Sequence, residues 1–175
     1  MTIVLVGMPG CGKSTAGRQL ARQLGWRFAD SDAEIVNEIG GPIREFFEEH
    51  GEERFREIEQ KVIEGLTHPA RLVLATGGGA VLGEANRIAM TRAGNQVVYL
   101  RASPEDLARR LRHDTQRPLL QGGDPLRTLR ELFKERDPLY REIASFVIDT
   151  GRTSVPTLVN LLCMQLELAG LTRRA

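Results

Sequence analysis

A glycine-rich segment directly after the first apolar run constrains the fold of this chain more than any other feature. Residues 7–14 read GMPGCGKS and satisfy the pattern G-x-x-x-x-G-K-[ST]. The apolar run Thr2–Val6 precedes them, and an amphipathic helical pattern follows Gly12. In this setting the N–H groups of the loop and the N-terminal end of the helix together cradle phosphate groups. The motif therefore predicts a polyphosphate site between a strand and a helix.

The positions of this loop have predicted contacts with a nucleotide. Glycines allow the backbone to curl until successive N–H groups point inward at phosphate oxygens. Lys13 is expected to reach the β- and γ-phosphates, and the Ser14 hydroxyl to ligate Mg²⁺. Cys11 could be redox-sensitive among these amides, but any small residue fits its position, and we interpret it as a backbone contact. We therefore predict ATP and Mg²⁺ as cofactors, with ATP contacted by Gly10, Cys11, Gly12, Lys13, Ser14 and Thr15.

Apolar runs of strand length recur along the chain and alternate with helical patterns. One helical pattern has its apolar residues on a single stripe over Glu52–Leu66, and Ser103 and Ser154 are typical N-caps of two others. Because parallel strands need a crossover that is usually a helix, the alternation predicts a three-layer α/β fold in one domain, residues 1–175. The expected strands of its five-stranded parallel sheet are Thr2–Val6, Arg27–Asp30, Arg71–Ala75, Gln96–Leu100 and Phe146–Asp149.

Composition argues against several classes of partner. Lys and Arg number 24 against 23 Asp and Glu, so a formal net charge of +1 provides no overall field for nucleic acid or anionic lipid. No apolar stretch approaches the roughly 18 residues of a membrane span, and Thr2–Val6 is too short for a signal sequence. Cys11 and Cys163 lie far apart without a CxxC pattern, which argues against disulfides and structural zinc. We expect a cytoplasmic monomer whose partner is a small molecule.

The acid that completes a magnesium site is not at its usual place in this sequence. Proteins with this loop often use an acid at the end of a second buried strand, but Arg71–Ala75 runs into Thr76 and three glycines. Asp30 and Asp32 are the alternative source, and alternation along a strand would point both carboxylates to one side of the sheet. One can serve the metal and the other the substrate. The same residues could instead cap a helix and add acidic charge to its first turn.

The candidates for substrate contact are ambiguous one by one. Arg56 lies in a helical pattern, where an arginine is more often a solvated surface residue than a ligand contact. The glycines at 77–79 allow close approach of backbone to a ligand, although any tight turn could use them. Arg112–Asp124 contains two glycines and loses helical periodicity, which predicts a mobile loop, either a lid or a surface connection. Arg117 in this loop and Arg136 complete the set.

Taken together, these segments resemble one family. The motifs GMPGCGKST, DSD, FR, GGG, RPLL and RDPLY occur in the order and at the spacing typical of shikimate kinases, and the likeness runs from Ile3 to Pro156. The resemblance implies a P-loop kinase fold with a substrate-binding segment over residues 31–66 and a short lid over residues 112–124. It also implies transfer of the γ-phosphate of ATP to the 3-hydroxyl of shikimate, a step of aromatic amino-acid biosynthesis.

The same resemblance implies roles for individual residues. Lys13, Asp32 and Arg117 are the catalytic residues, and Arg117 reaches the transferring phosphate from the lid. Asp30 joins Ser14 in the magnesium shell. The remaining implied contacts are to shikimate, by Asp32, Arg56, Gly78 and Arg136, and to the nucleotide, by Arg110, Arg117 and the turn Arg152–Pro156.

Physical chemistry supports these roles. A guanidinium binds a carboxylate through two parallel hydrogen bonds, so Arg56 and Arg136 together can hold the carboxylate of shikimate. Asp32 can accept hydrogen bonds from ring hydroxyls and orient one toward the γ-phosphate. Phosphoryl transfer depends on such positioning and on charge neutralisation, which Lys13, Mg²⁺ and Arg117 would supply.

Two alternative functions remain open at this level. Another small-molecule kinase, such as a gluconate kinase or a nucleoside monophosphate kinase, would share the phosphate loop and the sheet. A nucleobase acceptor would need a base-recognition pocket, and the sequence has no signature of one. A non-catalytic nucleotide sensor would keep the fold, but loss of Asp32 or Arg117 would be expected, and both are present.

Overall fold

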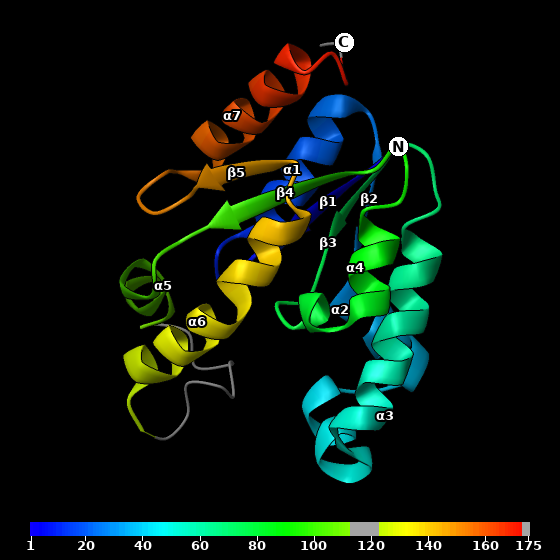
Figure 1. The fold of residues 1–175 in the computed structure, drawn as a ribbon, viewed down its shortest axis with the longest axis vertical. Coiled ribbons are helices and arrows are strands. Elements are labelled where there is room, and N and C mark those ends of the chain that lie inside the picture. The colour runs from blue at the N-terminus through cyan, green and yellow to red at the C-terminus, as the bar shows by residue number, and fades with distance from the viewer. Residues whose placement is uncertain (113–122, 173–175) are drawn as a thin grey trace.

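Five parallel strands form the centre of the molecule (Figure 1). The computed structural model describes residues 1–112 and 123–172. The strands are β1 (Thr2–Val6), β2 (Arg27–Asp30), β3 (Leu72–Ala75), β4 (Gln96–Arg101) and β5 (Phe146–Asp149). They form one sheet in the order β2-β3-β1-β4-β5, with every neighbouring pair parallel. The predicted α/β fold with a five-stranded parallel sheet is confirmed.

Two strand boundaries differ by one residue from the expected ones. β3 begins at Leu72 rather than Arg71, because Arg71 has a φ of 55°, which lies outside the extended region. β4 continues through Arg101, which pairs with Asp149 of β5. Both differences fall at strand ends, where apolar periodicity no longer distinguishes strand from loop.

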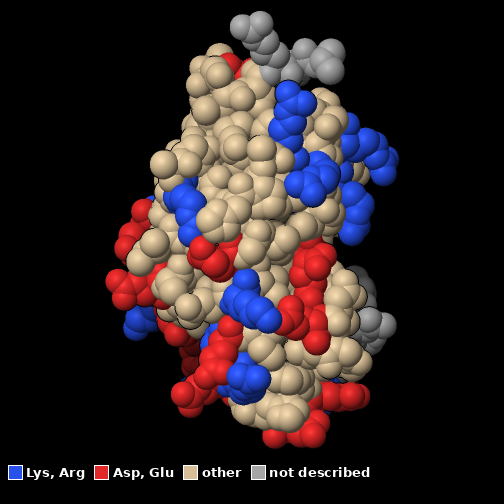
Figure 2. Space-filling model, turned by 90° about the vertical axis from the view of Figure 1, so that its right-hand side faces the viewer, with Lys and Arg blue, Asp and Glu red and all other residues tan. Residues whose placement is uncertain are grey.

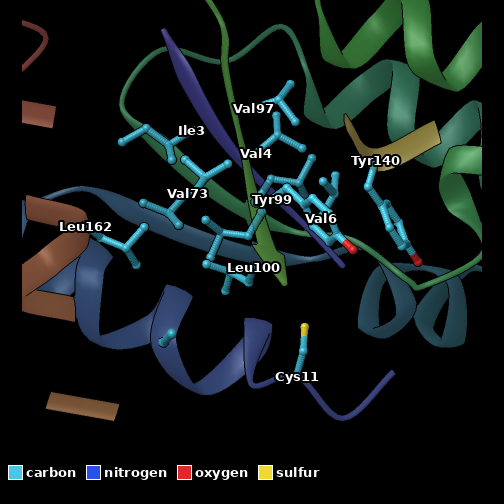
Figure 3. Close-up of a cluster of buried hydrophobic side chains, with 14 of the residues drawn as sticks. Ile3, Val4, Val6, Cys11, Val73, Val97, Tyr99, Leu100, Tyr140 and Leu162 are labelled. Atoms are coloured by element: carbon cyan, nitrogen blue, oxygen red, sulfur yellow. The ribbon is translucent and has the colours of Figure 1, made fainter. Parts of the chain in front are cut away.

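Helices cover both faces of this sheet. α1 packs against α7 on one face, and α6 contacts β4 from the other. Figure 3 shows Leu162 of α7 and Tyr140 of α6 on opposite sides of the strands. The helices are α1 (Lys13–Leu24), α2 (Ser31–Ile39), α3 (Ile43–Leu66), the 3₁₀ helix η1 (Ala80–Leu82), α4 (Glu84–Met90), α5 (Pro104–Leu111), α6 (Pro125–Ile143) and α7 (Val155–Leu168).

Helix α3 is longer than the sequence pattern predicts. The expected segment began at Glu52, whereas the helix begins at Ile43 and bends at Gly51. Gly51 has φ 83° and ψ 170°, a conformation that only glycine adopts readily. The bend interrupts the apolar stripe, so the first half of α3 does not continue the periodicity of the second. The two halves flank the site described below.

The two predicted serine caps are confirmed. The Ser103 hydroxyl accepts a hydrogen bond from the N–H of Asp106 at 3.1 Å, and Pro104 opens α5. The Ser154 hydroxyl accepts one from the N–H of Thr157 at 3.4 Å at the start of α7. Each bond satisfies one of the N–H groups that a helix leaves unpaired at its N-terminus.

The central strands explain where the site lies. All five residues of β1 and all four of β3 are buried, as expected for parallel strands covered on both faces. Figure 3 shows several of these side chains, including Ile3, Val4 and Val73, within the core. Chain order reverses beside β1, which pairs with β3 on one side and β4 on the other. The carboxyl ends of the strands at such a switch point form the crevice where open α/β sheets bind ligands.

The surface has no single dominant charge on the face shown in Figure 2. Both basic and acidic side chains occur there, the basic ones mainly in the upper part of the view and most acidic ones in the lower part, in keeping with the near balance of charges in the sequence. Across residues 1–112 and 123–172, no helix combines the length and apolarity needed to cross a membrane.

Candidate active site

The phosphate loop connects the carboxyl end of β1 to the first turn of α1. Gly12 is the N-cap residue of α1 and has φ 95°, a left-handed conformation that disfavours other residues. A Cβ on Gly7 would lie 2.5 Å from the carbonyl oxygen of Leu100, so only glycine fits where the loop passes β4. These two glycines let the loop curl over the helix N-terminus, a geometry suited to binding phosphate.

Lys13 is the first residue of α1, and its side chain reaches back into this loop. Its Nζ donates hydrogen bonds to the carbonyl oxygens of Gly7 at 2.8 Å and Met8 at 2.9 Å, and the residue is 8% exposed. The Nζ is also 3.6 Å from the Sγ of Cys11, whose side chain is fully buried (Figure 3). The loop therefore holds the Lys13 ammonium group at the N-terminus of α1, while Cys11 packs as a small core residue.

Ser14 and Asp30 meet at the predicted magnesium position. The Ser14 hydroxyl donates to Oδ2 of Asp30 at 2.5 Å, although 16 positions separate the two residues. Oδ1 of Asp30 accepts from the N–H groups of Asp32 at 2.9 Å and Ala33 at 3.3 Å, so Asp30 also caps α2. The hydroxyl and carboxylate oxygens are ligands that Mg²⁺ accepts beside phosphate oxygens and water. Both interpretations of Asp30, as metal ligand and as helix cap, fit its position.

The prediction that Asp32 continues the strand and points to the same side of the sheet as Asp30 is wrong. Asp32 does not continue the strand: β2 ends at Asp30, and Asp32 is an exposed residue in the first turn of α2. The reason is that the Asp30 cap starts the helix immediately, which ends the alternation of side chains. Asp32 nevertheless faces the site, because a Cβ on Gly77 would lie 2.6 Å from its Oδ1.

A cavity of about 970 Å³ extends from the phosphate loop to helix α3 and the glycine turn. Gly12–Thr15 line one end, and residues of α3 and α6 line the other. It brings together most of the predicted site residues, namely Gly12, Lys13, Ser14, Thr15, Asp30, Asp32, Arg56, Gly78 and Arg136. Gly10 and Cys11 belong to the same loop but do not line this cavity.

Arg56 is not the solvated surface arginine that its helix position favours. Its side chain is 28% exposed, and its Nη1 donates to Oε1 of Glu59 at 2.8 Å. Glu52 lies 3.6 Å away on the other side. Burial raises the pKa of the Glu59 carboxyl above its ordinary value, and nearby Arg56 lowers it while Asp32 raises it. Arg56 is thus held in place at the cavity wall by a buried carboxylate.

Arg136 lies against the glycine turn, beside Gly78. The residue is 8% exposed, and its Nε has no hydrogen-bond partner among the described residues. Its Nη1 would be 3.2 Å from a Cβ on Gly78, and the ring of Pro9 would be closer still at 2.8 Å. Only glycine therefore fits at position 78. A buried guanidinium N–H without a partner is costly unless a ligand supplies an acceptor.

Comparison with known proteins distinguishes among the small-molecule kinases that share this loop. The family model for shikimate kinase matches residues 9–167. The chain belongs to the shikimate kinase family. Shikimate kinase of Paracidovorax citrulli is 55% identical over 175 residues, covering 98% of this chain and 94% of the relative. The predicted family is confirmed, and with it the prediction of an ATP-dependent phosphotransferase.

Solved structures of shikimate kinases share this fold closely. Shikimate kinase from Acinetobacter baumannii, solved in complex with shikimate, superposes with a TM-score of 0.89 at 44% identity, covering 97% of this chain and 93% of that chain. A gluconokinase from Sinorhizobium meliloti gives a TM-score of 0.62 at 19% identity, covering 96% of each chain. The second likeness is one of fold alone, because fold by itself does not carry function.

Not all residues implied by the shikimate kinase resemblance line the cavity. Arg110 of α5 donates to the carbonyl oxygens of Cys11 at 3.3 Å and Gly151 at 2.9 Å, and also to that of Thr150. It therefore connects the phosphate loop to the turn after β5. Arg152 is exposed in that turn. Of the predicted lid, residues 112–124, only Arg112, Gly123 and Asp124 are among the described residues. Arg117 is not.

Two site residues of this shikimate kinase family member escaped the sequence analysis. Glu59 lies four positions after Phe55 and three before Val62, on the buried stripe of α3, where a carboxylate requires a partner. Its position three residues after Arg56 was the available signal. Ser31 accepts a hydrogen bond from the N–H of Gly77 at 3.0 Å and so ties the acidic segment to the glycine turn. No sequence pattern signals that contact.

Proposed function

We propose that this chain transfers the γ-phosphate of ATP to the 3-hydroxyl of shikimate, giving shikimate 3-phosphate and ADP. The carrying observation is that the phosphate loop and two arginines, Arg56 and Arg136, line the same cavity. A substrate with a hydroxyl on one side of its ring and a carboxylate on the other matches this combination of functions. The bond that forms joins the 3-hydroxyl oxygen to phosphorus, and the bond to the ADP oxygen breaks.

Charge complementarity supports shikimate as the acceptor. Arg56 and Arg136 bring two positive charges, and the buried Glu59 balances one of them through its contact with Arg56. Arg136 has an unpaired Nε and is positioned to bind an external carboxylate. Arg136 can thus receive one anionic group, and both shikimate and gluconate have a carboxylate. Ring shape must then discriminate between them, and the shikimate kinase relatives favour shikimate.

The reacting hydroxyl would be oriented by Asp32. Its carboxylate lies beside Gly77 at the cavity wall, between the phosphate loop and the arginines. An accepted hydrogen bond from the 3-hydroxyl would point one lone pair of that oxygen at the phosphorus. Asp32 is exposed and accessible for proton transfer as the new bond forms. Lys13 would neutralise charge on the phosphates, and we propose that Arg117 of the lid does so from the other side.

Ser14 and Asp30 fit the binding of Mg²⁺. The ion would neutralise charge on the β- and γ-phosphates when bound. The 2.5 Å contact between the Ser14 hydroxyl and the Asp30 carboxylate places two oxygen ligands together beside the loop. Because Asp30 also caps α2, its position is fixed by two backbone N–H groups. We also propose Arg110 and Arg152 as adenine-side contacts, on the basis of their place around the turn after β5.

We further propose that the protein acts as a monomer in the cytoplasm, with residues 1–175 forming one domain. Cys11 and Cys163 are both buried and lie far apart in the sequence without a CxxC pattern, which supports a reducing compartment.

The assay that tests this function measures ADP release with different acceptors. Shikimate, gluconate and each nucleoside monophosphate are compared at equal concentration with ATP and Mg²⁺. We expect shikimate to give a kcat/KM at least about a hundredfold above that of any other acceptor, because none of the others combines its ring with its carboxylate. If ADP were released equally fast with gluconate and with shikimate, the chain would be a small-molecule kinase without specificity for shikimate. Release that does not depend on acceptor would identify a nucleotide hydrolase or sensor.

Asp30→Asn separates the metal role from the substrate role. We expect the Mg²⁺ concentration for half-maximal rate to rise about fivefold, because an amide is a weaker ligand than a carboxylate, while the KM for shikimate stays within about twofold. Asparagine is also a good N-cap, so α2 should remain folded. Asp32→Asn is the matched variant, and the opposite pattern is expected there. If the Asp30 variant changed the shikimate KM and not the Mg²⁺ requirement, the two aspartates would exchange roles.

A further inference from the structure

Two buried tyrosines, Tyr99 of β4 and Tyr140 of α6, have their rings in tilted contact in the core next to the glycine turn. Their ring centroids are 4.9 Å apart, and the residues are 0% and 1% exposed (Figure 3). Each hydroxyl donates one hydrogen bond of 2.6 Å, Tyr99 to Oδ1 of Asp137 and Tyr140 to the carbonyl oxygen of Gly78. Burial raises the pKa of both hydroxyls, so each remains a protonated donor at neutral pH.

The Tyr140 bond determines which way a peptide of the glycine turn faces. Gly78 and Arg136 line the cavity, whereas Tyr140 is part of the core behind them. The bond engages the Gly78 carbonyl oxygen with the hydroxyl of Tyr140, a buried side chain that does not line the cavity, so that acceptor is satisfied from the core side. The peptide between Gly78 and Gly79 is planar and trans, so the N–H of Gly79 points the opposite way.

Tyr140 is also coupled to Arg136. The two residues are four positions apart on α6 and therefore lie on the same face of the helix. The guanidinium is near enough to the phenol to counteract part of the effect of burial on its pKa. Arg136 Nη1 is itself packed against Gly78. One buried hydroxyl thus lies next to the two groups that form this wall of the cavity.

We propose that Tyr140 is a positioning residue for the acceptor substrate: its hydroxyl holds the Gly78 carbonyl out of the cavity and so keeps Arg136 available for the substrate carboxylate. A backbone carbonyl that loses a buried partner must find another donor. The guanidinium of Arg136 is a charged donor close to it, since its Nη1 would be 3.2 Å from a Cβ on Gly78, and the glycines at 77–79 let the peptide turn toward it. The carbonyl would then compete with the substrate for Arg136. This inference rests on the proposed acceptor site.

Tyr140→Phe tests the proposal, with Tyr99→Phe as its matched control. Both changes keep the stacked rings and remove one buried hydroxyl that makes a 2.6 Å hydrogen bond. We expect Tyr140→Phe to raise the KM for shikimate about fivefold, the size of effect one lost hydrogen bond has, with kcat and the KM for ATP within about twofold. Tyr99→Phe should lower the melting temperature similarly and leave all three constants within about twofold.

A double variant tests the route through Arg136. If Tyr140 acts by keeping Arg136 free, Tyr140→Phe should change the shikimate KM much less in an Arg136→Lys background than in the wild type. An unchanged KM in Tyr140→Phe overturns the proposal, and so does an equal rise in both phenylalanine variants, which would show a structural cost alone. Titration calorimetry with shikimate in the absence of ATP gives the same comparison as a Kd. If the wild type prefers another acceptor, the proposed function is wrong. The KM of Tyr140→Phe relative to wild type is then measured with that acceptor, which still tests the role of Tyr140.

Discussion

Lys13→Met should lower kcat/KM for ATP by at least about a thousandfold, equivalent to about 4 kcal/mol of transition-state stabilisation. The ammonium lies at the N-terminus of α1 within the loop that binds the phosphates, and methionine fills similar volume without charge. Negative charge on the transferring group and the leaving oxygen would lose its nearest cation. The measurement is ADP release under saturating shikimate, over a range of ATP concentrations.

Lys61→Met is the control for this prediction. Lys61 is an α3 lysine with a 75% exposed side chain, paired with Glu38 at 2.8 Å. Its replacement removes the same charge without touching the cavity, so activity should stay within about twofold, since exposed pairs contribute little. Lys13 also holds the carbonyl groups of Gly7 and Met8, so the melting temperature is measured for both variants. A folded Lys13 variant within about tenfold of wild type would remove Lys13 from the chemistry.

The fold could be predicted from local patterns because its strands are buried runs. β3 is apolar throughout and β1 is apolar after Thr2, and the motif after β1 has one structural context, a strand followed by a helix. The order of the strands could not be read from the sequence, since it depends on which strands pair across long separations. The bend of α3 at Gly51 could not be predicted either, because a glycine interrupts the apolar periodicity both where it ends a helix and where it only bends one.

The site was predictable to the extent that its residues belong to motifs. The loop residues and Asp30 follow from the chemistry of phosphate and magnesium, whereas Arg56 by itself suggested a surface residue. Its burial depends on Glu59, three positions later on the same helix, and on the glycine turn, which lies in a distant part of the chain. Tyr140 gave no chemical signal at all, because a tyrosine in an apolar helix face is typical of a core. Its contact with Gly78 spans 62 positions.

Arg136→Lys should lower kcat/KM for shikimate by more than about tenfold and leave the KM for ATP within about twofold. Lysine keeps the charge but loses the planar fork that binds both carboxylate oxygens. Arg56 cannot compensate, because it is already paired with Glu59 and lies near Glu52. Arg127→Lys is the control, since Arg127 is on the same helix with a 78% exposed side chain and should tolerate the change.

A substrate analogue separates loss of the fork from loss of packing. Shikimate with its carboxylate reduced to an alcohol should be a poor acceptor for wild type, because the buried guanidinium of Arg136 then keeps an unpaired Nε. With the Arg136→Lys variant, the same reduction should cost much less, since both changes delete one interaction and their effects are not additive. Two losses that multiplied independently would mean that Arg136 acts on the fold of the wall and not on the carboxylate. In that case the carboxylate would have to bind at Arg56, with Glu59 displaced from it.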